Sequence, residues 1–157
     1  MKVFITGING YLGKELAIDL QKEGYTITGC DIIGQESSGV HLFDIRSEKI
    51  FDIIPENVDV IIHLAALSSD PLCNDNAYEC FDLNVMGTLN LLRCAELKKC
   101  KQLIFASSEW VYNDNSNKKI CNEKTLINPF SLKSEYALSK LTSEINLMQK
   151  YHDSFFH

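Results

Sequence analysis

The sequence predicts an α/β fold, a doubly wound parallel sheet with helices on both faces. Short apolar runs alternate along the chain with amphipathic helical segments, as in strand–helix–strand units. The run at 58–66 is nearly continuous in apolar residues, which suits a parallel strand covered on both faces. A glycine-rich turn joins the first strand to the first helix. Strands are expected at 3–5, 25–30, 40–45, 58–66 and 102–106, and helices from 11 onward and at 46–54, 77–100 and 134–151.

The composition is that of an ordinary globular protein. The 157 residues are enough for one domain with a core, and 45% of them are apolar and 23% charged. The net charge of −6 and the lack of a basic cluster argue against binding to nucleic acid or to an anionic membrane. No apolar run approaches the ~18 residues of a membrane-spanning helix, and the N-terminal strand does not resemble a signal peptide. We expect one cytoplasmic domain.

Six cysteines, at positions 30, 73, 80, 94, 100 and 121, show no metal-binding spacing. There is no C-x-x-C pair, and the histidines do not cluster with the cysteines. We therefore expect reduced thiols and no metal site. His63 lies inside the apolar run at 58–66, which favours a hydrogen-bonded core histidine over a ligand or a base.

Three glycines follow the first strand at a spacing of three. Gly7 allows a tight turn, Gly10 lets a pyrophosphate approach the backbone, and Gly13 lets the helix pack closely on its strand. The N-terminus of the helix that begins at Tyr11 offers free N–H groups to an anion. The first gap is one residue longer than in G-x-G-x-x-G, so packing alone is an alternative reason for these glycines.

Asp31 ends the second strand, at the tip where a dinucleotide-binding sheet places an acid. Its carboxylate can accept hydrogen bonds from both hydroxyls of an adenosine ribose. It also repels a 2′-phosphate, so it favours NAD over NADP. Without the glycine turn, Asp31 would be read as a turn or helix-capping aspartate.

Tyr136 and Lys140 are four residues apart and share one face of the last predicted helix. An ammonium beside a phenol lowers the pKa of the phenol, so Tyr136 is suited to take a proton from an alcohol. Ser107 or Ser108, at the carboxyl end of the fifth strand, is placed to bond the oxygen of that alcohol. A Tyr-x-x-x-Lys pair is common in helices, and its weight comes from the glycine turn, Asp31 and the serines in the same chain.

Together these motifs resemble the extended short-chain dehydrogenase/reductases, specifically the NAD-dependent epimerase/dehydratase group that acts on nucleotide sugars. The resemblance covers nearly all of residues 2–152, with the motifs in the family's order. The matching segments are Thr6-Gly-Ile-Asn-Gly-Tyr-Leu-Gly13, Asp31, Asp44-Ile45, His63-Leu-Ala-Ala66, Asn84-Val-Met-Gly-Thr88, Ser107-Ser-Glu-Trp-Val-Tyr112 and Tyr136-Ala-Leu-Ser-Lys140, followed by Glu144.

The resemblance implies a Rossmann-type fold, bound NAD and a UDP- or TDP-sugar substrate. It makes Tyr136 the base, Ser108 the residue that orients the sugar hydroxyl, and Lys140 the residue that holds the nicotinamide ribose. A dehydratase of this group has an Asp-Glu pair where this chain has Glu109 and Trp110, so epimerisation or simple oxidoreduction is favoured. The implied cofactor contacts are Gly7, Asn9, Gly10, Tyr11, Leu12, Asp31, Asp44, Ile45, Leu64, Ala65, Ala66, Asn84, Tyr136 and Lys140.

Members of this family are longer and add a C-terminal lobe that binds the nucleotide and the sugar. We therefore expect residues 1–157 to form a single NAD-binding domain, truncated before that lobe, that turns over sugar nucleotides only at background. A homodimer is expected through helices 77–100 and 134–151. The alternatives are an NAD-binding or interaction module without turnover, and a non-functional remnant.

Overall fold

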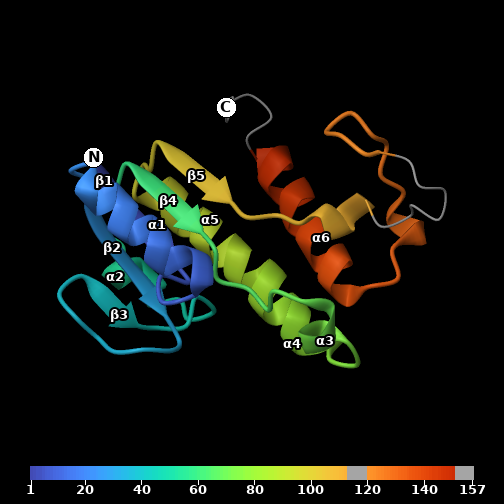
Figure 1. Cartoon of the computed structure of the whole chain (residues 1–157), viewed down its shortest axis with the longest axis horizontal. Coiled ribbons are helices and arrows are strands. Elements are labelled where there is room, and N and C mark those ends of the chain that lie inside the picture. The colour runs from blue at the N-terminus through green and yellow to red at the C-terminus, as the bar shows by residue number, and fades with distance from the viewer. Residues whose placement is uncertain (113–119, 151–157) are drawn as a thin grey trace.

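The computed structural model describes residues 1–112 and 120–150, and the α/β fold is confirmed (Figure 1). In these residues five strands form one parallel sheet: β1 Lys2–Thr6, β2 Thr26–Asp31, β3 Val40–Leu42, β4 Val60–His63 and β5 Gln102–Phe105. The strand order is β3-β2-β1-β4-β5, so the chain winds outward from β1 in both directions. The strands predicted at 40–45 and 58–66 are longer than β3 and β4, because the chain leaves the sheet at their carboxyl ends to line a cavity.

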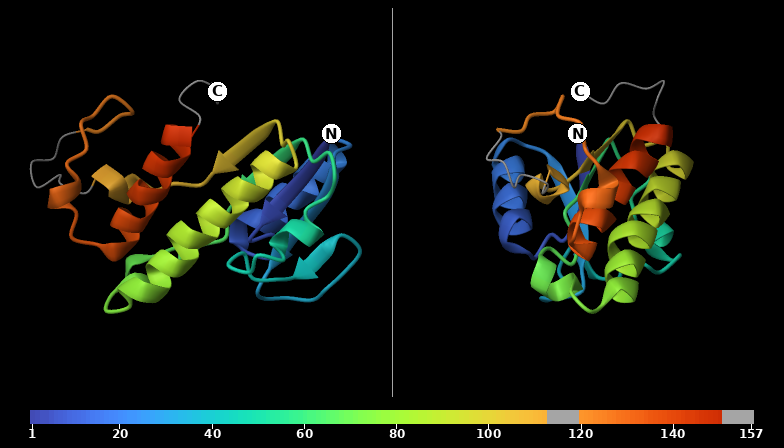
Figure 2. Two further views of the ribbon diagram at one scale, coloured as in Figure 1. Left: turned by 180° about the vertical axis from the view of Figure 1, so that it is seen from behind. Right: turned by 90° about the vertical axis from the view of Figure 1, so that its right-hand side faces the viewer.

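Helices cover both faces of the sheet, as the end-on view in Figure 2 shows. Helix α1 lies on one face, whereas α2 and α5 lie on the other, with α6 packed beside α5. The helices are α1 Tyr11–Lys22, α2 Ile50–Ile53, α3 Asp70–Cys73, α4 Ala77–Phe81, η1 Asp82–Met86, α5 Gly87–Leu97, η2 Glu109–Tyr112, η3 Pro129–Ser131 and α6 Glu135–Lys150.

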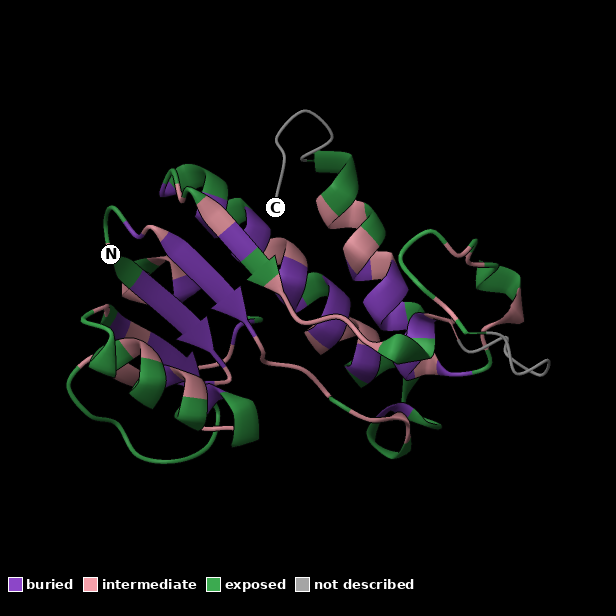
Figure 3. Ribbon diagram, turned by 45° about the horizontal axis from the view of Figure 1, so that its top comes forward, coloured by how far each residue is buried: buried purple, intermediate pink, exposed green. Residues whose placement is uncertain are grey.

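Two apolar clusters hold the layers together, and both include residues of β1 and β4 (Figure 3). Successive side chains of a strand point to opposite faces. Ile5 therefore packs with Ala17 of α1, while Phe4 packs with Ile50 of α2 and Leu91 of α5. Phe4 and Ile5 are fully buried. Burial of such a side chain contributes about 1.5–3 kcal/mol.

The helix predicted at 77–100 is present as three consecutive pieces, α4, η1 and α5. The middle piece, η1, is a π-helical turn, a form that often accompanies functional sites. It contains Asn84, which costs helix propensity. Gly87 begins α5, and an added Cβ there would lie 2.7 Å from Cδ1 of Ile45. The glycine thus lets α5 pack closely against the segment that follows β3.

The last predicted helix is confirmed as α6, and Tyr151, its predicted end, lies outside the described residues. Ser134 precedes α6, and its Oγ accepts a hydrogen bond of 3.1 Å from the N–H of Ala137. This contact is a side-chain cap for the first turn. Residues 113–119 of the predicted polar loop at 113–128 also lie outside the described residues. The short helix α3 was not predicted.

The expectation that all cysteines are reduced is wrong for one pair. Cys73 ends α3 and Cys80 lies in α4, and the two form a disulfide with their Cα atoms 5.1 Å apart. The turn at 74–76 brings these short helices back on each other. The separation of seven residues has no recognised disulfide signature, so the sequence did not reveal the pair.

Within residues 1–112 and 120–150, no helix has both the length and the apolar character needed to cross a bilayer. In the same residues, His, Cys, Asp and Glu side chains form no group of three or more that could hold a metal ion.

Candidate functional site

A cavity of about 590 Å³ lies at the carboxyl ends of the strands. Its walls are the turns after β1, β2, β4 and β5, the segment after β3, and the first turns of α6. Beneath it, the order of the strands reverses between β1 and β4. Open α/β sheets bind their ligands at this kind of position.

The glycine turn forms the wall after β1. Gly7 has a φ of +72°, and a Cβ there would lie 2.9 Å from the backbone nitrogen of Ala65. A Cβ on Gly13 would lie 2.2 Å from the carbonyl oxygen of Gly7, so side chains are excluded at both positions. Gly10 is the N-cap of α1, and no side chain caps the helix. Its first N–H groups therefore face the cavity as an anion-binding terminus.

Asp31 is buried at the end of β2 and lines the same cavity. One carboxylate oxygen accepts the N–H of Asn9 at 2.9 Å, and the other accepts the N–H of Ile33 at 3.1 Å. A carboxylate oxygen accepts about two hydrogen bonds. Each oxygen of Asp31 thus keeps capacity for a ligand hydroxyl. Burial and the neighbouring carboxylates raise the pKa of the adjacent Cys30 thiol to about 12.

Beyond Asp31 the cavity has an apolar slot. Ile33 follows β2, Phe43 and Ile45 follow β3, and Leu83 comes from η1. Ile45 is almost fully buried. An apolar slot beside a buried carboxylate has the character of a site for a flat heterocyclic ring.

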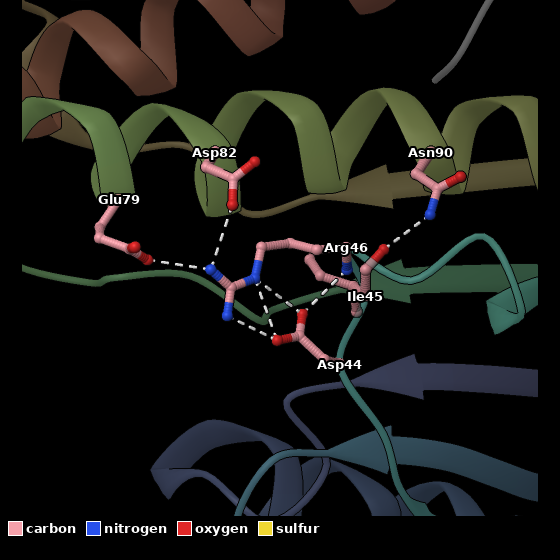
Figure 4. Close-up of polar contacts among 6 residues, drawn as sticks. All are labelled: Asp44, Ile45, Arg46, Glu79, Asp82 and Asn90. Carbon is pink, nitrogen blue, oxygen red and sulfur yellow. Dashed lines mark hydrogen bonds and ion pairs between the residues drawn. The ribbon is translucent and has the colours of Figure 1, made fainter.

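Asp44 lies between Phe43 and Ile45, but its carboxylate binds Arg46 (Figure 4). The ion pair has an N–O distance of 2.7 Å. The hydrogen bond from Arg46 holds the pKa of Asp44 below its ordinary value, against the opposing effect of partial burial. Asp44 therefore does not line the slot itself, but its bond to Arg46 holds the backbone between Phe43 and Ile45, which do.

His63, at the end of β4, is confirmed as a hydrogen-bonded core histidine. Its Nδ1 lies 2.7 Å from Oγ1 of Thr6, and its Nε2 lies 2.9 Å from Oγ1 of Thr88. Burial, together with the charge of Lys140, lowers the pKa of His63 to about 3. The ring is therefore neutral at pH 7 and joins β1, β4 and α5.

The opposite end of the cavity carries Tyr136 and Lys140, one turn apart on α6. The Nζ of Lys140 donates a 2.8 Å hydrogen bond to the carbonyl of Ala106 and lies 4.8 Å from the ring centroid of Phe105. It is 6.0 Å from the ring centroid of Tyr136. Burial lowers the pKa of Lys140 to about 8, although Glu144 acts in the opposite direction. The rings of Trp110 and Tyr136 pack edge to face, with their centroids 6.4 Å apart.

The two serines after β5 have different surroundings. Ser107 lines the cavity, and its buried Oγ has no hydrogen-bond partner among the described residues. The Oγ of Ser108 accepts the N–H of Trp110 at 3.2 Å and lies 3.4 Å from a carboxylate oxygen of Glu109. The first of the two serines, rather than the second, is thus the one in the cavity wall.

Asn84 is buried in η1 and anchors the segment after β4. Its Oδ1 accepts the N–H of Leu67 at 2.8 Å, and its Nδ2 donates to the carbonyl of Leu67 at 3.1 Å. The same Nδ2 lies 2.9 Å from the Oγ of Ser139 on α6. Asn84 therefore ties a cavity wall to the helix that bears Tyr136.

The fold brings most of the predicted site residues to one cavity. Of the predicted set, the residues that do not line it are Asn9, Asp44, Asn84 and Ser108. Asn9 donates its N–H to Asp31, which lines the cavity. The other three bond to Arg46, Leu67 and Trp110, which lie outside its wall. The sequence analysis missed Ile33, Phe43 and Leu83, which also line the cavity. Each lies within two residues of a predicted site residue, Asp31, Asp44 or Asn84, and this proximity could have indicated them. The predicted residues that line the cavity are Gly7, Gly10, Tyr11, Leu12, Asp31, Ile45, Leu64, Ala65, Ala66, Tyr136 and Lys140.

A doubly wound sheet with a glycine turn, an acid at the end of β2 and a Tyr–Lys helix defines a Rossmann-type domain of the short-chain dehydrogenase/reductase kind. The NAD dependent epimerase/dehydratase family matches residues 3–156. The chain belongs to this family of NAD-dependent enzymes.

Two similar proteins are UDP-glucose 4-epimerases. That of Mycoplasma genitalium is 33% identical over 162 residues, which cover 93% of this chain and 47% of the relative. That of Dictyostelium discoideum is 31% identical over 160 residues, covering 91% of this chain and 45% of the relative. This chain thus spans about half the length of these relatives.

Solved structures show the same fold. The UDP-glucose 4-epimerase of Bifidobacterium longum, in complex with NAD+ and UDP, superposes with a TM-score of 0.84 at 26% identity. The match covers 98% of this chain and 50% of that one. The Thermotoga maritima UDP-glucose 4-epimerase with UDP-glucose has a TM-score of 0.87 at 21% identity, over 98% of this chain and 52% of that one.

Proposed function

We propose that this chain supplies the NAD-binding and proton-transfer half of a nucleotide-sugar epimerase. The observation that supports this most is one continuous cavity with Asp31 on the β2 side and Tyr136 and Lys140 on the β5 side. These residues are placed across the carboxyl edge of the sheet, as the parts of an extended dinucleotide require.

The residues present fit NAD at each of its chemical parts. The uncapped N-terminus of α1 suits a pyrophosphate, Asp31 suits the two hydroxyls of the adenosine ribose, and the apolar slot suits adenine. The β5 side, with Lys140, takes the nicotinamide ribose. NAD bound in this way supplies the acceptor for a hydride from the sugar.

In the proposed reaction, the phenolate of Tyr136 takes the proton of the sugar hydroxyl whose carbon loses the hydride, and becomes the neutral phenol. Lys140, which lines the same cavity, binds the nicotinamide ribose. Ser108, the neighbour of Ser107, is proposed to orient the sugar hydroxyl from outside the wall of the cofactor cavity. Glu109 and Trp110 stand where a dehydratase has its Asp-Glu pair, which favours epimerisation or simple oxidoreduction over dehydration.

We propose a UDP-sugar as the substrate and a TDP-sugar as the alternative. The support comes from the similar proteins, which include the solved structures with UDP and with UDP-glucose described above. A nucleotide held away from the reacting carbon positions the sugar, since binding energy from remote groups orients the reacting centre.

Isothermal titration calorimetry with NAD+, followed by titration of the NAD+-loaded protein with UDP-glucose, tests the proposal. We expect saturable binding of NAD+. We also expect the 4-epimer to form when a C-terminal lobe of the kind found in family members is added to the chain. NAD+ binding without any effect of UDP- or TDP-sugars under those conditions would instead identify an NAD-binding module. Failure to bind NAD+ would rule out both functions.

We also propose a homodimer formed through the helical segment of α4, η1 and α5 and through α6. The outer surface of α6 exposes Leu138, Ile145 and Met148, and Met86 and Leu97 are exposed on the adjoining helices. Such apolar surface favours a two-fold interface. A monomeric mass in light scattering at micromolar concentration would contradict it.

The cytoplasmic location stays a prediction that cell fractionation tests.

A further inference from the structure

We propose that Arg46 is a positioning residue of the cofactor site, which holds the apolar slot in the shape that takes the adenine ring. This inference rests on the proposed NAD-binding function. Arg46 itself does not line the cavity, whereas its neighbours Phe43 and Ile45 do. The inference therefore concerns how a side chain outside the cavity sets the geometry of its wall.

The guanidinium of Arg46 bonds three carboxylates from two parts of the chain (Figure 4). Its Nε and Nη2 bind Asp44, at 3.0 and 2.7 Å from the same carboxylate oxygen. Its Nη1 binds Glu79 of α4 at 2.9 Å and Asp82 of η1 at 3.1 Å. The planar fork of arginine makes such a multiple contact possible, and lysine cannot reproduce it.

A second contact holds the same segment from the other side. The Nδ2 of Asn90 on α5 donates to the carbonyls of Ile45 and Ser47, both at 2.9 Å. Gly87 leaves room for the Ile45 side chain. The segment after β3 is thus fixed to the helical layer twice, through the Arg46 side chain and through the carbonyls of Ile45 and Ser47.

The slot is formed by both of the segments that Arg46 joins. Phe43 and Ile45 come from the segment after β3, and Leu83 comes from η1, next to Asp82. Loss of Arg46 would leave Asp44, Glu79 and Asp82 close together without a cation. Like charges at such distances repel, so the two walls of the slot should move apart. These groups are partly exposed, which moderates the effect.

The experiment compares Arg46→Met, Arg46→Lys and Arg93→Met. Arg93 is the other arginine of the sequence, and it is exposed on α5. Calorimetry with NAD+, NADP+ and AMP measures binding. We expect Arg46→Met to lower the affinities for NAD+ and AMP by the same factor, about tenfold. The ratio of the NAD+ and NADP+ affinities should stay unchanged, because Asp31 is not altered. The affinities of Arg46→Lys for NAD+ and AMP should lie between those of Arg46→Met and the unsubstituted protein. Arg93→Met should bind both as the unsubstituted protein does.

A double variant, Glu79→Gln with Asp82→Asn, provides an independent arm because it keeps the Asp44–Arg46 pair but removes the two charges that attract Arg46 to the helices. We expect the double variant to bind AMP more weakly than the unsubstituted protein. When it is combined with Arg46→Met, the two losses of AMP affinity should not add. Wild-type affinity for AMP in either variant, or full additivity, would overturn the inference. A wild-type protein that binds no NAD+ would instead overturn the proposed function. Thermal melts show whether each variant folds.

Discussion

Asn84 and Ser139 are joined by a hydrogen bond of 2.9 Å between Nδ2 and Oγ, although they lie 55 positions apart. Both residues are buried, and both sit behind the cavity rather than in it. Ser139 also donates to the carbonyl of Tyr136 at 2.8 Å. The contact places the helix of the proposed base against the π-helical turn and, through Leu67, against the segment after β4.

Replacement of Asn84 by alanine should lower the free energy of unfolding by about 2–4 kcal/mol, because it leaves the Leu67 N–H and C=O without their partner. Asn146→Ala is the matched control, since its Nδ2 makes a local bond to the carbonyl of Thr142. The control should change stability by less than about 0.5 kcal/mol. Urea unfolding measures both. Equal stability of the two variants would contradict the anchoring role of Asn84.

Asp31 should determine the choice of cofactor. We expect NAD+ to bind more tightly than NADP+, because the buried carboxylate would face the 2′-phosphate. Asp31→Ala should weaken the binding of NAD+ by about 1–3 kcal/mol, because charge-assisted hydrogen bonds are lost. The difference in affinity between NAD+ and NADP+ should therefore become smaller. Competitive titration checks this. Equal or tighter binding of NADP+ to the unsubstituted protein would refute it.

His63 should make the fold sensitive to mild acid. Its pKa is about 3 in the folded protein, below the ordinary value of 6.5. As the pH falls below about 6.5, the unfolded state binds a proton that the folded state does not. The free energy of unfolding should therefore fall by about 1.4 kcal/mol for each pH unit from this residue alone.

Urea unfolding between pH 7 and pH 5.5 tests this pH dependence, because ordinary Asp and Glu side chains, with pKa values of about 3.9 and 4.3, stay almost fully ionised in that range. His63→Gln should be less stable at pH 7 but should have the flatter profile. His41→Gln, at a partly exposed histidine, should keep the steep profile. A profile for His63→Gln as steep as that of the unsubstituted protein would exclude His63 as the cause.

Turnover should require more than this chain. Catalysis needs the reacting carbon about 3–3.5 Å from its partner, and the described cavity accounts for the cofactor. We expect residues 1–157 alone to convert UDP-sugars at or near background, as followed by product chromatography. In a protein that combines this chain with a lobe that binds the sugar nucleotide, Tyr136→Phe should abolish turnover and leave the affinity for NAD+ unchanged. Robust epimerisation by the isolated chain would show that its own residues hold the sugar.

The Cys73–Cys80 disulfide can be counted directly. Reductant should raise the number of thiols that react in denaturant by two. By the loop-entropy relation, closing so short a loop stabilises the fold by about 2–3 kcal/mol. Cys73→Ser should lose that amount and abolish the increase. An unchanged thiol count on reduction would show that the pair is not oxidised in the purified protein.

The sequence by itself determined the features that depend on local chemistry and periodicity. Alternating apolar runs predicted the strand and helix order, and the strand–glycine–helix turn at Gly7 predicted an anion site, because only glycine fits the conformation and the close approach found there. Asp31, Tyr136 and Lys140 could be selected because each side chain has a distinct chemical role at a fixed place relative to a strand or helix.

The tertiary structure decided what depends on contacts between distant segments. Whether Ser107 or Ser108 lines the cavity follows from how the chain bends after β5, which periodicity does not report. The partner of Asn84 lies on another helix, and the partners of Arg46 come from two segments. The Cys73–Cys80 disulfide depends on a turn between two short helices. In each case a long-range contact or a non-repetitive backbone fixed the outcome, and neither leaves a period or a spacing in the sequence.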